Sequence, residues 1–126
     1  MVSIDKTSSK PYYEQLILGV KEDILSGSLQ SGDRLPSVRE MARLLMMNPN
    51  TVSKAYKVLE AQEVIITVKG KGTYVKKIDT ELRDDYQIQK IKKKLNELII
   101  EAHYLNVSKK EINQWLDESY QHLKGE

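Results

Sequence analysis

Two short amphipathic segments follow each other closely within residues 37–62, and each begins with its own helix-start signal. Ser37 and Glu40 have the spacing of a capping box, in which the hydroxyl and the carboxylate each accept a hydrogen bond from a backbone N–H. Asn48 followed by Pro49 is typical of an N-cap and a first helical residue. The sequence therefore predicts two helices joined by a turn of about four residues, which is the arrangement of a helix-turn-helix.

Apolar side chains recur at helical spacing in both segments, so each helix has one face for a core. These side chains are Val38, Met41, Ala42 and Leu45 in the first segment, and Val52, Ala55, Tyr56 and Leu59 in the second. A preceding helix is predicted from Pro11 to Ser26, because Pro11 suits a first helical turn and Gly27 suits a C-terminal stop. Residues 28–33 are rich in turn formers and are interpreted as a linker.

A β-hairpin is predicted after these helices, where the apolar period changes from 3.6 to 2. Residues 64–68 are rich in β-branched side chains, and residues 73–75 match them. In the turn between them, Gly70 and Gly72 allow the backbone to approach another surface closely, and Lys71 adds a positive charge. Taken alone, this tip favours a plain β-turn with a solvated lysine. Its place after a helix-turn-helix, within 77 residues, indicates the wing of a winged helix-turn-helix.

The last part of the chain has a heptad seam, in which apolar residues are spaced alternately by three and four positions. The seam consists of Ile88, Ile91, Leu95, Leu98, Ala102 and Leu105 within a long helix predicted to begin at Asp79. Asn106 ends this helix, and a second capping box of Ser108 and Glu111 opens a last one. The seam packs either on its own domain or on the same helix of a second chain. Because the last helix is too short to cover it, a homodimer is favoured.

These elements predict a mainly α fold with a small β-hairpin wing, an α+β arrangement. Residues 1–77 are expected to form the winged helix-turn-helix domain and residues 78–126 the helical dimerisation tail. The first part carries 12 Lys and Arg against 8 Asp and Glu, whereas the tail carries 8 against 10. The basic first part favours a polyanionic partner, although ordinary scatter of surface charge remains the alternative.

Composition excludes several classes of site and location. The chain has no Cys, which excludes disulfides, thiolate zinc sites and cysteine nucleophiles. Its longest apolar run has four residues, Leu44–Met47, against the roughly 20 needed to span a membrane. The N-terminus lacks the apolar segment of a secretory signal. We therefore expect a cytoplasmic protein with no membrane partner.

The polar face of the second short helix is the candidate for DNA recognition. A helix fits the major groove of B-DNA, its first turn reaches base edges, and its N–H groups face phosphate. The residues off the apolar face are Asn50, Thr51, Ser53, Lys54 and Lys57. Short hydrogen-bonding groups followed by cations suit base and phosphate contacts, although any exposed helix face can carry such residues.

An enzymatic function is not expected. His103 and His122 stand alone on different helices, without carboxylate or Cys partners at ligand spacing, which indicates surface or packing histidines. Ser, Thr and Tyr residues occur without a plausible base triad, and Gly70-Lys71-Gly72 lacks the strand-to-helix context of a phosphate loop. We predict no metal and no cofactor. A small-molecule effector is not identifiable from these residues.

Four blocks of residues, in order, resemble the GntR family of bacterial transcription regulators. They are Pro11-Tyr12-Tyr13-Glu14-Gln15-Leu16, the run from Gly32 to Ala42, the run from Asn48 to Tyr56, and the run from Gly70 to Val75. The resemblance covers about residues 10–76, and the short helical tail is similar to that of the YtrA subfamily. It implies a DNA-binding regulator, a repressor acting as a homodimer on a two-fold symmetric double-stranded operator. The competing interpretation is a winged helix that binds protein or RNA without operator specificity.

The same resemblance implies roles for individual residues. Arg39 reaches into the DNA interface, and Arg34 and Ser37 lie near the phosphate backbone. The residues Asn50, Thr51, Ser53 and Lys54 begin the recognition helix, Tyr56 contacts phosphate, and Lys71 with Gly72 forms a wing tip in the minor groove. Pro49 departs from the family, some members of which have a base-reading Arg there. As alternatives, Arg34 or Arg39 pairs with Asp33, Glu40 or a neighbour, and Tyr56 only packs.

Overall fold

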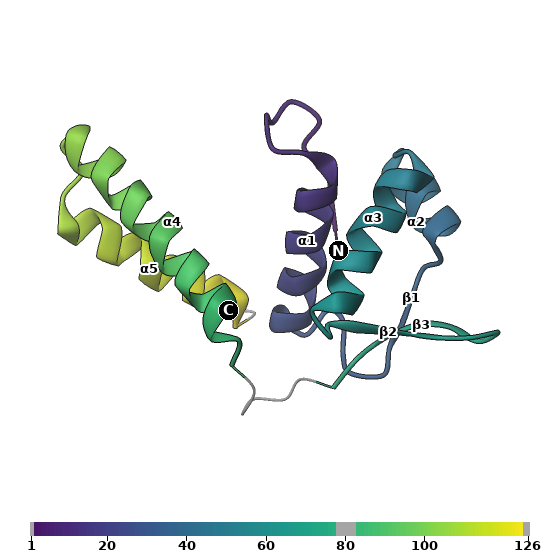
Figure 1. Ribbon diagram of the computed structural model, residues 1–126. Helices are drawn as coiled ribbons and strands as arrows, with labels where there is room; N and C mark the ends of the chain where they lie inside the picture. The colour runs from purple at the N-terminus through teal and green to yellow at the C-terminus, as the bar shows by residue number, and fades with distance from the viewer. Residues whose placement is uncertain (1, 78–82, 125–126) are drawn as a thin grey trace. The chain divides into compact units, whose positions relative to one another are not determined.

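The structure, a computed structural model, describes residues 2–77 and 83–124. The chain forms two compact units that divide near residue 78, and each unit is described here by itself (Figure 1). Among the described residues, no helix is both long enough and apolar enough to cross a membrane.

The first unit contains three helices and a small antiparallel sheet (Figure 1). The helices are α1 (Tyr12–Ser26), α2 (Val38–Leu45) and α3 (Pro49–Ala61), and the strands are β1 (Arg34–Leu35), β2 (Ile65–Val68) and β3 (Gly72–Val75). The predicted helix-turn-helix and hairpin are thus confirmed. Strand β1 was not predicted; it pairs with β3, which gives the sheet order β1-β3-β2 and joins the wing to the segment before α2.

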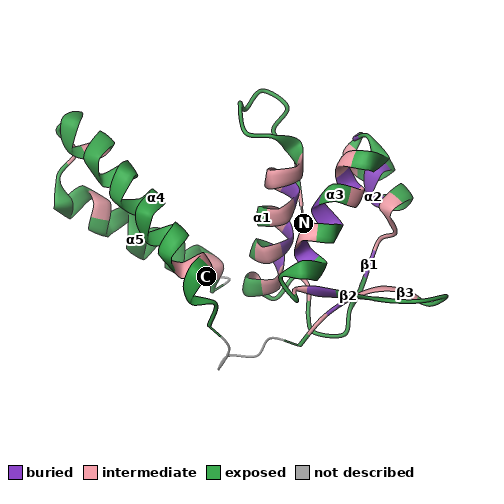
Figure 2. Ribbon diagram, in the orientation of Figure 1, coloured by how far each residue is buried: buried purple, intermediate pink, exposed green. Residues whose placement is uncertain are grey.

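The core of this unit lies between α1, α2, α3 and the base of the sheet (Figure 2). Its side chains are aliphatic apart from one tyrosine: Leu16, Val20, Leu35, Met41, Ala42, Met47, Val52, Ala55, Tyr56, Leu59, Ile65 and Val75. All four residues of the predicted apolar face of α3 are buried. Since α3 contacts both other helices, its outward residues are held in a fixed orientation.

The predicted capping signals of α2 and α3 are confirmed. The Ser37 backbone N–H donates to Glu40 Oε1 and the Glu40 N–H donates to Ser37 Oγ, both at 3.1 Å. Asn48 Oδ1 accepts from the Asn50 N–H at 2.8 Å. Helix α1 begins one residue later than predicted, because Pro11 has extended backbone and is the N-cap. Gly27 ends that helix with a φ of 88°, as expected for a left-handed C-cap.

The N-terminal segment stabilises the turn between α2 and α3 through a side-chain hydrogen bond. Met46 has a left-handed backbone, and its carbonyl oxygen accepts a hydrogen bond from Lys6 Nζ at 2.8 Å. The segment that carries Lys6 is itself held by the Gln15 side chain, which bonds both backbone groups of Asp5. Val2 lies where a side chain at Gly19 would otherwise stand.

The second unit contains helices α4 (Asp85–Tyr104) and α5 (Lys109–Leu123). Asp84 caps α4, so the helix begins later than predicted; residues 79–82 lie outside the described residues. Asn106, with a φ of 64°, lies in the turn after α4. The capping box of Ser108 and Glu111 is confirmed by hydrogen bonds of 3.2 Å and 3.1 Å.

Candidate nucleic-acid interface

The outward face of α3 carries the polar residues that the sequence singled out. Asn50, Lys54 and Lys57 are exposed, and Thr51 and Ser53 are partly exposed. They lie opposite the buried face because α3 is amphipathic, with its core positions three and four residues apart. The first two turns of α3 therefore present amide, hydroxyl and ammonium groups together on one surface.

The backbone at the start of α3 does not offer free N–H groups to a phosphate, contrary to the expectation from the sequence. Pro49 has no N–H, and the Asn50 N–H donates to the Asn48 side chain. The Thr51 N–H donates to the Asn48 carbonyl at 3.0 Å. Because these donors are occupied, an anion near this end must be held by side chains.

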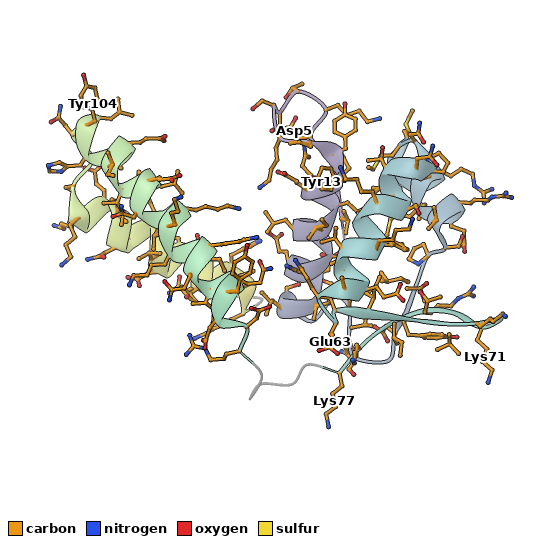
Figure 3. The ribbon with its side chains drawn as sticks, in the orientation of Figure 1. Asp5, Tyr13, Glu63, Lys71, Lys77 and Tyr104 are labelled. Atoms are coloured by element: carbon orange, nitrogen blue, oxygen red, sulfur yellow. The ribbon has the colours of Figure 1, made fainter. Side chains whose placement is uncertain are left out.

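Lys54 is held against α1. Its Nζ lies 3.9 Å from the centroid of the Tyr13 ring, which is within the range of a cation–π contact. Tyr13 belongs to the upper part of α1 as drawn in Figure 3. The contact fixes the direction of the Lys54 side chain and links α3 to α1, and it was not predicted from the sequence.

Arg34 and Arg39 are exposed, and neither guanidinium has a hydrogen bond or an ion pair among the described residues. The alternative that they pair with Asp33 or Glu40 is wrong for this structure. Asp33 accepts a hydrogen bond from the Gln30 N–H at 2.8 Å, and Glu40 completes the capping box. The hydrogen bonds from Ser37, with weaker attraction to nearby arginines, lower the pKa of Glu40. These arginines are therefore available to an external anion.

The wing is a closed hairpin with an exposed cation at its tip. The Lys71 N–H donates to the Val68 carbonyl, and the Tyr74 hydroxyl donates to the Lys71 carbonyl at 3.0 Å. Lys71 lies at the far end of the hairpin, away from the helices (Figure 3). The tip thus has a fixed backbone, and the Lys71 side chain is exposed to solvent.

Arg34 and Gly72 are close neighbours across β1 and β3. A Cβ built on Gly72 would stand 2.9 Å from Arg34 Nε and 3.5 Å from one of its terminal nitrogens. Gly72 also has a φ of 123°, which L side chains rarely adopt. Because Gly72 has no side chain, the Arg34 guanidinium can lie against the wing at this position.

We expect Gly72→Ala to displace the Arg34 guanidinium and to weaken DNA binding. The backbone strain should cost about 1–2 kcal/mol of folding stability, and Gly70→Ala serves as the matched control because its φ is 78° with open space around it. Thermal melting of both variants measures the strain. In an Arg34→Ala background, Gly72→Ala should weaken binding less than in the wild type; equal losses in both backgrounds would contradict the coupling.

Tyr56 belongs to the core and not to the exposed surface. Only 6% of the residue is exposed, and its hydroxyl donates to the Pro36 carbonyl at 2.7 Å. Burial, and to a lesser extent the Glu40 carboxylate, raises the pKa of Tyr56, so the hydroxyl stays protonated and donating. The packing interpretation therefore describes Tyr56, and we leave it out of the proposed interface.

Sequence reasoning missed Arg43. This exposed residue lines a hollow at the corner between α2 and α3, together with Arg39, Ala42, Met47 and Pro49. The signal was present, because positions four apart on a helix lie on one face and Arg39 was already selected. Within the described residues, no group of three or more His, Asp or Glu side chains is arranged to hold a metal ion.

The seam of α4 is exposed in the single chain. The exposed fractions are 65% for Ile91, 46% for Leu95, 60% for Leu98 and 73% for Leu105, while Ile88 and Ala102 are partly buried. Helix α5 adds half-exposed Trp115 and Leu116 to the same apolar groove. The second unit therefore carries a continuous apolar surface that α5 leaves uncovered.

Comparison with known proteins gives consistent matches. Residues 12–75 match the protein family described as "bacterial regulatory proteins, gntR family". The HTH-type transcriptional repressor YtrA of Bacillus subtilis strain 168 is 44% identical over 125 residues, which cover 99% of this chain and 96% of YtrA. A transcriptional antiterminator from Listeria monocytogenes EGD-e superposes with a TM-score of 0.93 at 43% identity, over 100% of this chain and 94% of that one. A GntR family regulator from Listeria monocytogenes gives a TM-score of 0.65 at 37% identity, over 91% and 98%.

Proposed function

Because this chain belongs to the GntR family of bacterial regulatory proteins, and is therefore a DNA-binding transcription regulator, we propose that it is a repressor that binds a two-fold symmetric operator as a homodimer. The observation that carries this proposal is the set of exposed cations around α2, α3 and the wing. Among the described residues, Arg34, Arg39 and Lys71 have no ion pair to neutralise them. The role of repressor follows the name of the Bacillus subtilis relative.

In this proposal, residues 1–77 form the DNA-binding domain, and α3 enters the major groove of the operator. Asn50, Thr51 and Ser53 reach base edges, because they are short hydrogen-bonding groups in the first turns. The cations around them have different parts of the duplex within reach. Arg39, on α2, reads bases. The DNA backbone is bound by Arg34, Ser37, Lys54 and Lys57. The wing tip, Lys71 with Gly72, enters the minor groove.

The tail, residues 78–126, supplies the dimer in this proposal. Its support is the exposed seam of α4, since monomeric soluble proteins rarely expose large contiguous apolar patches. A second copy of the same surface would cover the seam through an isologous contact. A two-fold dimer then presents two recognition helices to two half-sites, which gives the operator its symmetry.

Two alanine substitutions test the assigned roles. Arg39→Ala is expected to weaken binding to the operator and to relax the base preference, because an arginine fork distinguishes guanine by about 1–3 kcal/mol. Lys71→Ala is expected to weaken binding more evenly across sequences, because a wing-tip charge contacts the backbone or the minor groove, where the bases are poorly distinguished. Both residues are exposed, so thermal melting should stay unchanged. Anisotropy on specific and scrambled duplexes measures both effects; wild-type operator binding by Arg39→Ala would refute the placement of α2 at the DNA.

A second candidate function is binding to single-stranded RNA, which the name of the Listeria monocytogenes antiterminator suggests. Such sites use exposed aromatic side chains as stacking platforms. On α3 and the wing, Tyr56 is buried, and Tyr74 is only partly exposed with its hydroxyl bonded to the wing backbone. Duplex DNA is therefore the favoured partner. Competition between duplex DNA and single-stranded RNA at moderate salt separates the two functions.

A further inference from the structure

The corner between α2 and α3 contains a hollow whose polar lining consists of two arginines. Arg39 and Arg43 stand one helical turn apart on α2, and Ala42, Met47 and Pro49 complete the lining. Ala42 and Met47 are buried core residues, and the proline ring of Pro49 carries no donor. The charged groups that this hollow offers to an anion are therefore guanidinium groups.

The charge of this hollow is not neutralised within the described residues. Neither Arg39 nor Arg43 has a hydrogen bond or an ion pair through its side chain. Glu40 and Arg43 attract each other only weakly, and Glu40 Oε1 already accepts a hydrogen bond from the Ser37 N–H. Two like charges at positions i and i+4 repel each other. An anion between them relieves that repulsion, whereas a neutral base edge relieves less of it.

The neighbouring backbone points to the same ligand. Helix N-termini commonly bind phosphate through free N–H groups, but the first-turn donors of α3 are occupied by Asn48. Pro49, which lines the hollow, is the first residue of α3. The arginines therefore stand beside the helix end that would otherwise supply a phosphate contact.

We propose that this hollow is a phosphate site of the DNA interface, in which Arg43 binds a backbone phosphate with Arg39 beside it. The proposal rests on the proposed function, because the phosphate belongs to the bound operator. Arg43 is then a further DNA contact that acts on the backbone and carries no base preference. Arg39 adds positive charge next to this phosphate, while its guanidinium reads bases as in the proposed function.

The test compares Arg43→Gln and Arg43→Lys with the wild type on an operator duplex selected by the wild type and on a scrambled duplex. Arg43→Gln should weaken binding to both duplexes by the same factor. It should reduce the slope of log K against log salt concentration by about 1 for each bound subunit. Arg43→Lys should keep the wild-type slope, because a phosphate also accepts an ammonium. Lys76→Gln is the control for net charge, since Lys76 is already paired with Glu63 at 3.1 Å.

Two results would overturn the site while leaving the proposed function intact. An unchanged slope in Arg43→Gln would show that Arg43 does not contact the DNA backbone. A loss confined to the selected duplex would show that Arg43 reads a base. Arg43 is exposed, so an unchanged thermal melting curve verifies that the variant is folded. A wild-type protein that binds no duplex would instead refute the proposed function and this site with it.

Discussion

Leu95→Glu is expected to convert the protein from a dimer into a monomer at micromolar concentration. Leu95 lies in the middle of the α4 seam and is 46% exposed in the single chain, so the chain itself tolerates a polar side chain there. In the proposed dimer the carboxylate would be buried without a partner, which costs several kcal/mol. Operator affinity should then fall by about 10²–10⁴, because the two DNA-binding domains lose their linkage.

Sedimentation velocity of the wild type and the variant measures the first effect, and anisotropy on a two-half-site operator measures the second. Asn96→Glu is the matched control, because Asn96 is exposed, adjacent in sequence and outside the seam. The control should remain a dimer. Dimeric Leu95→Glu, or a wild type that is monomeric at high concentration, would mean that the seam does not join two chains.

Operator affinity is expected to fall by about 10³–10⁵ between 50 and 200 mM salt, the loss typical of a protein that neutralises roughly 6–10 phosphates. The reason is counterion release, which follows from the number of cations that contact the backbone. Arg34, Arg43, Lys54, Lys57 and Lys71 of each subunit supply enough charge for this number. Anisotropy across a salt series measures the slope, and a flat response would contradict an electrostatic interface.

The elements of the first unit were predictable because each has a local signal. The capping box of Ser37 and Glu40, the Asn48-Pro49 start and the change of apolar period after α3 depend on residues close in sequence, and the structure confirms them. Strand β1 has two residues, too few for a period, and exists through its pairing with β3. Strand β1 therefore could not be predicted from the local sequence.

The details of the interface depend on contacts between distant segments, which periodicity does not reveal. The stacking of Lys54 on Tyr13 and the place of Arg34 beside Gly72 join residues 20 or more positions apart. The hydroxyl of Tyr56 reaches the Pro36 carbonyl for the same reason, and this contact makes Tyr56 a core residue. In the tail, the period identified the apolar seam, but the identity of its partner is a property of the assembly.

Selection of bound sequences from a random duplex pool tests symmetric operator recognition without a known operator or a known target gene. We expect enrichment of one sequence with two-fold symmetry, whose half-sites lie one helical turn or a multiple of it apart. Enrichment of an asymmetric single site would contradict the symmetric dimer. A pool that stays random after repeated rounds at low salt would contradict specific DNA recognition by α2, α3 and the wing.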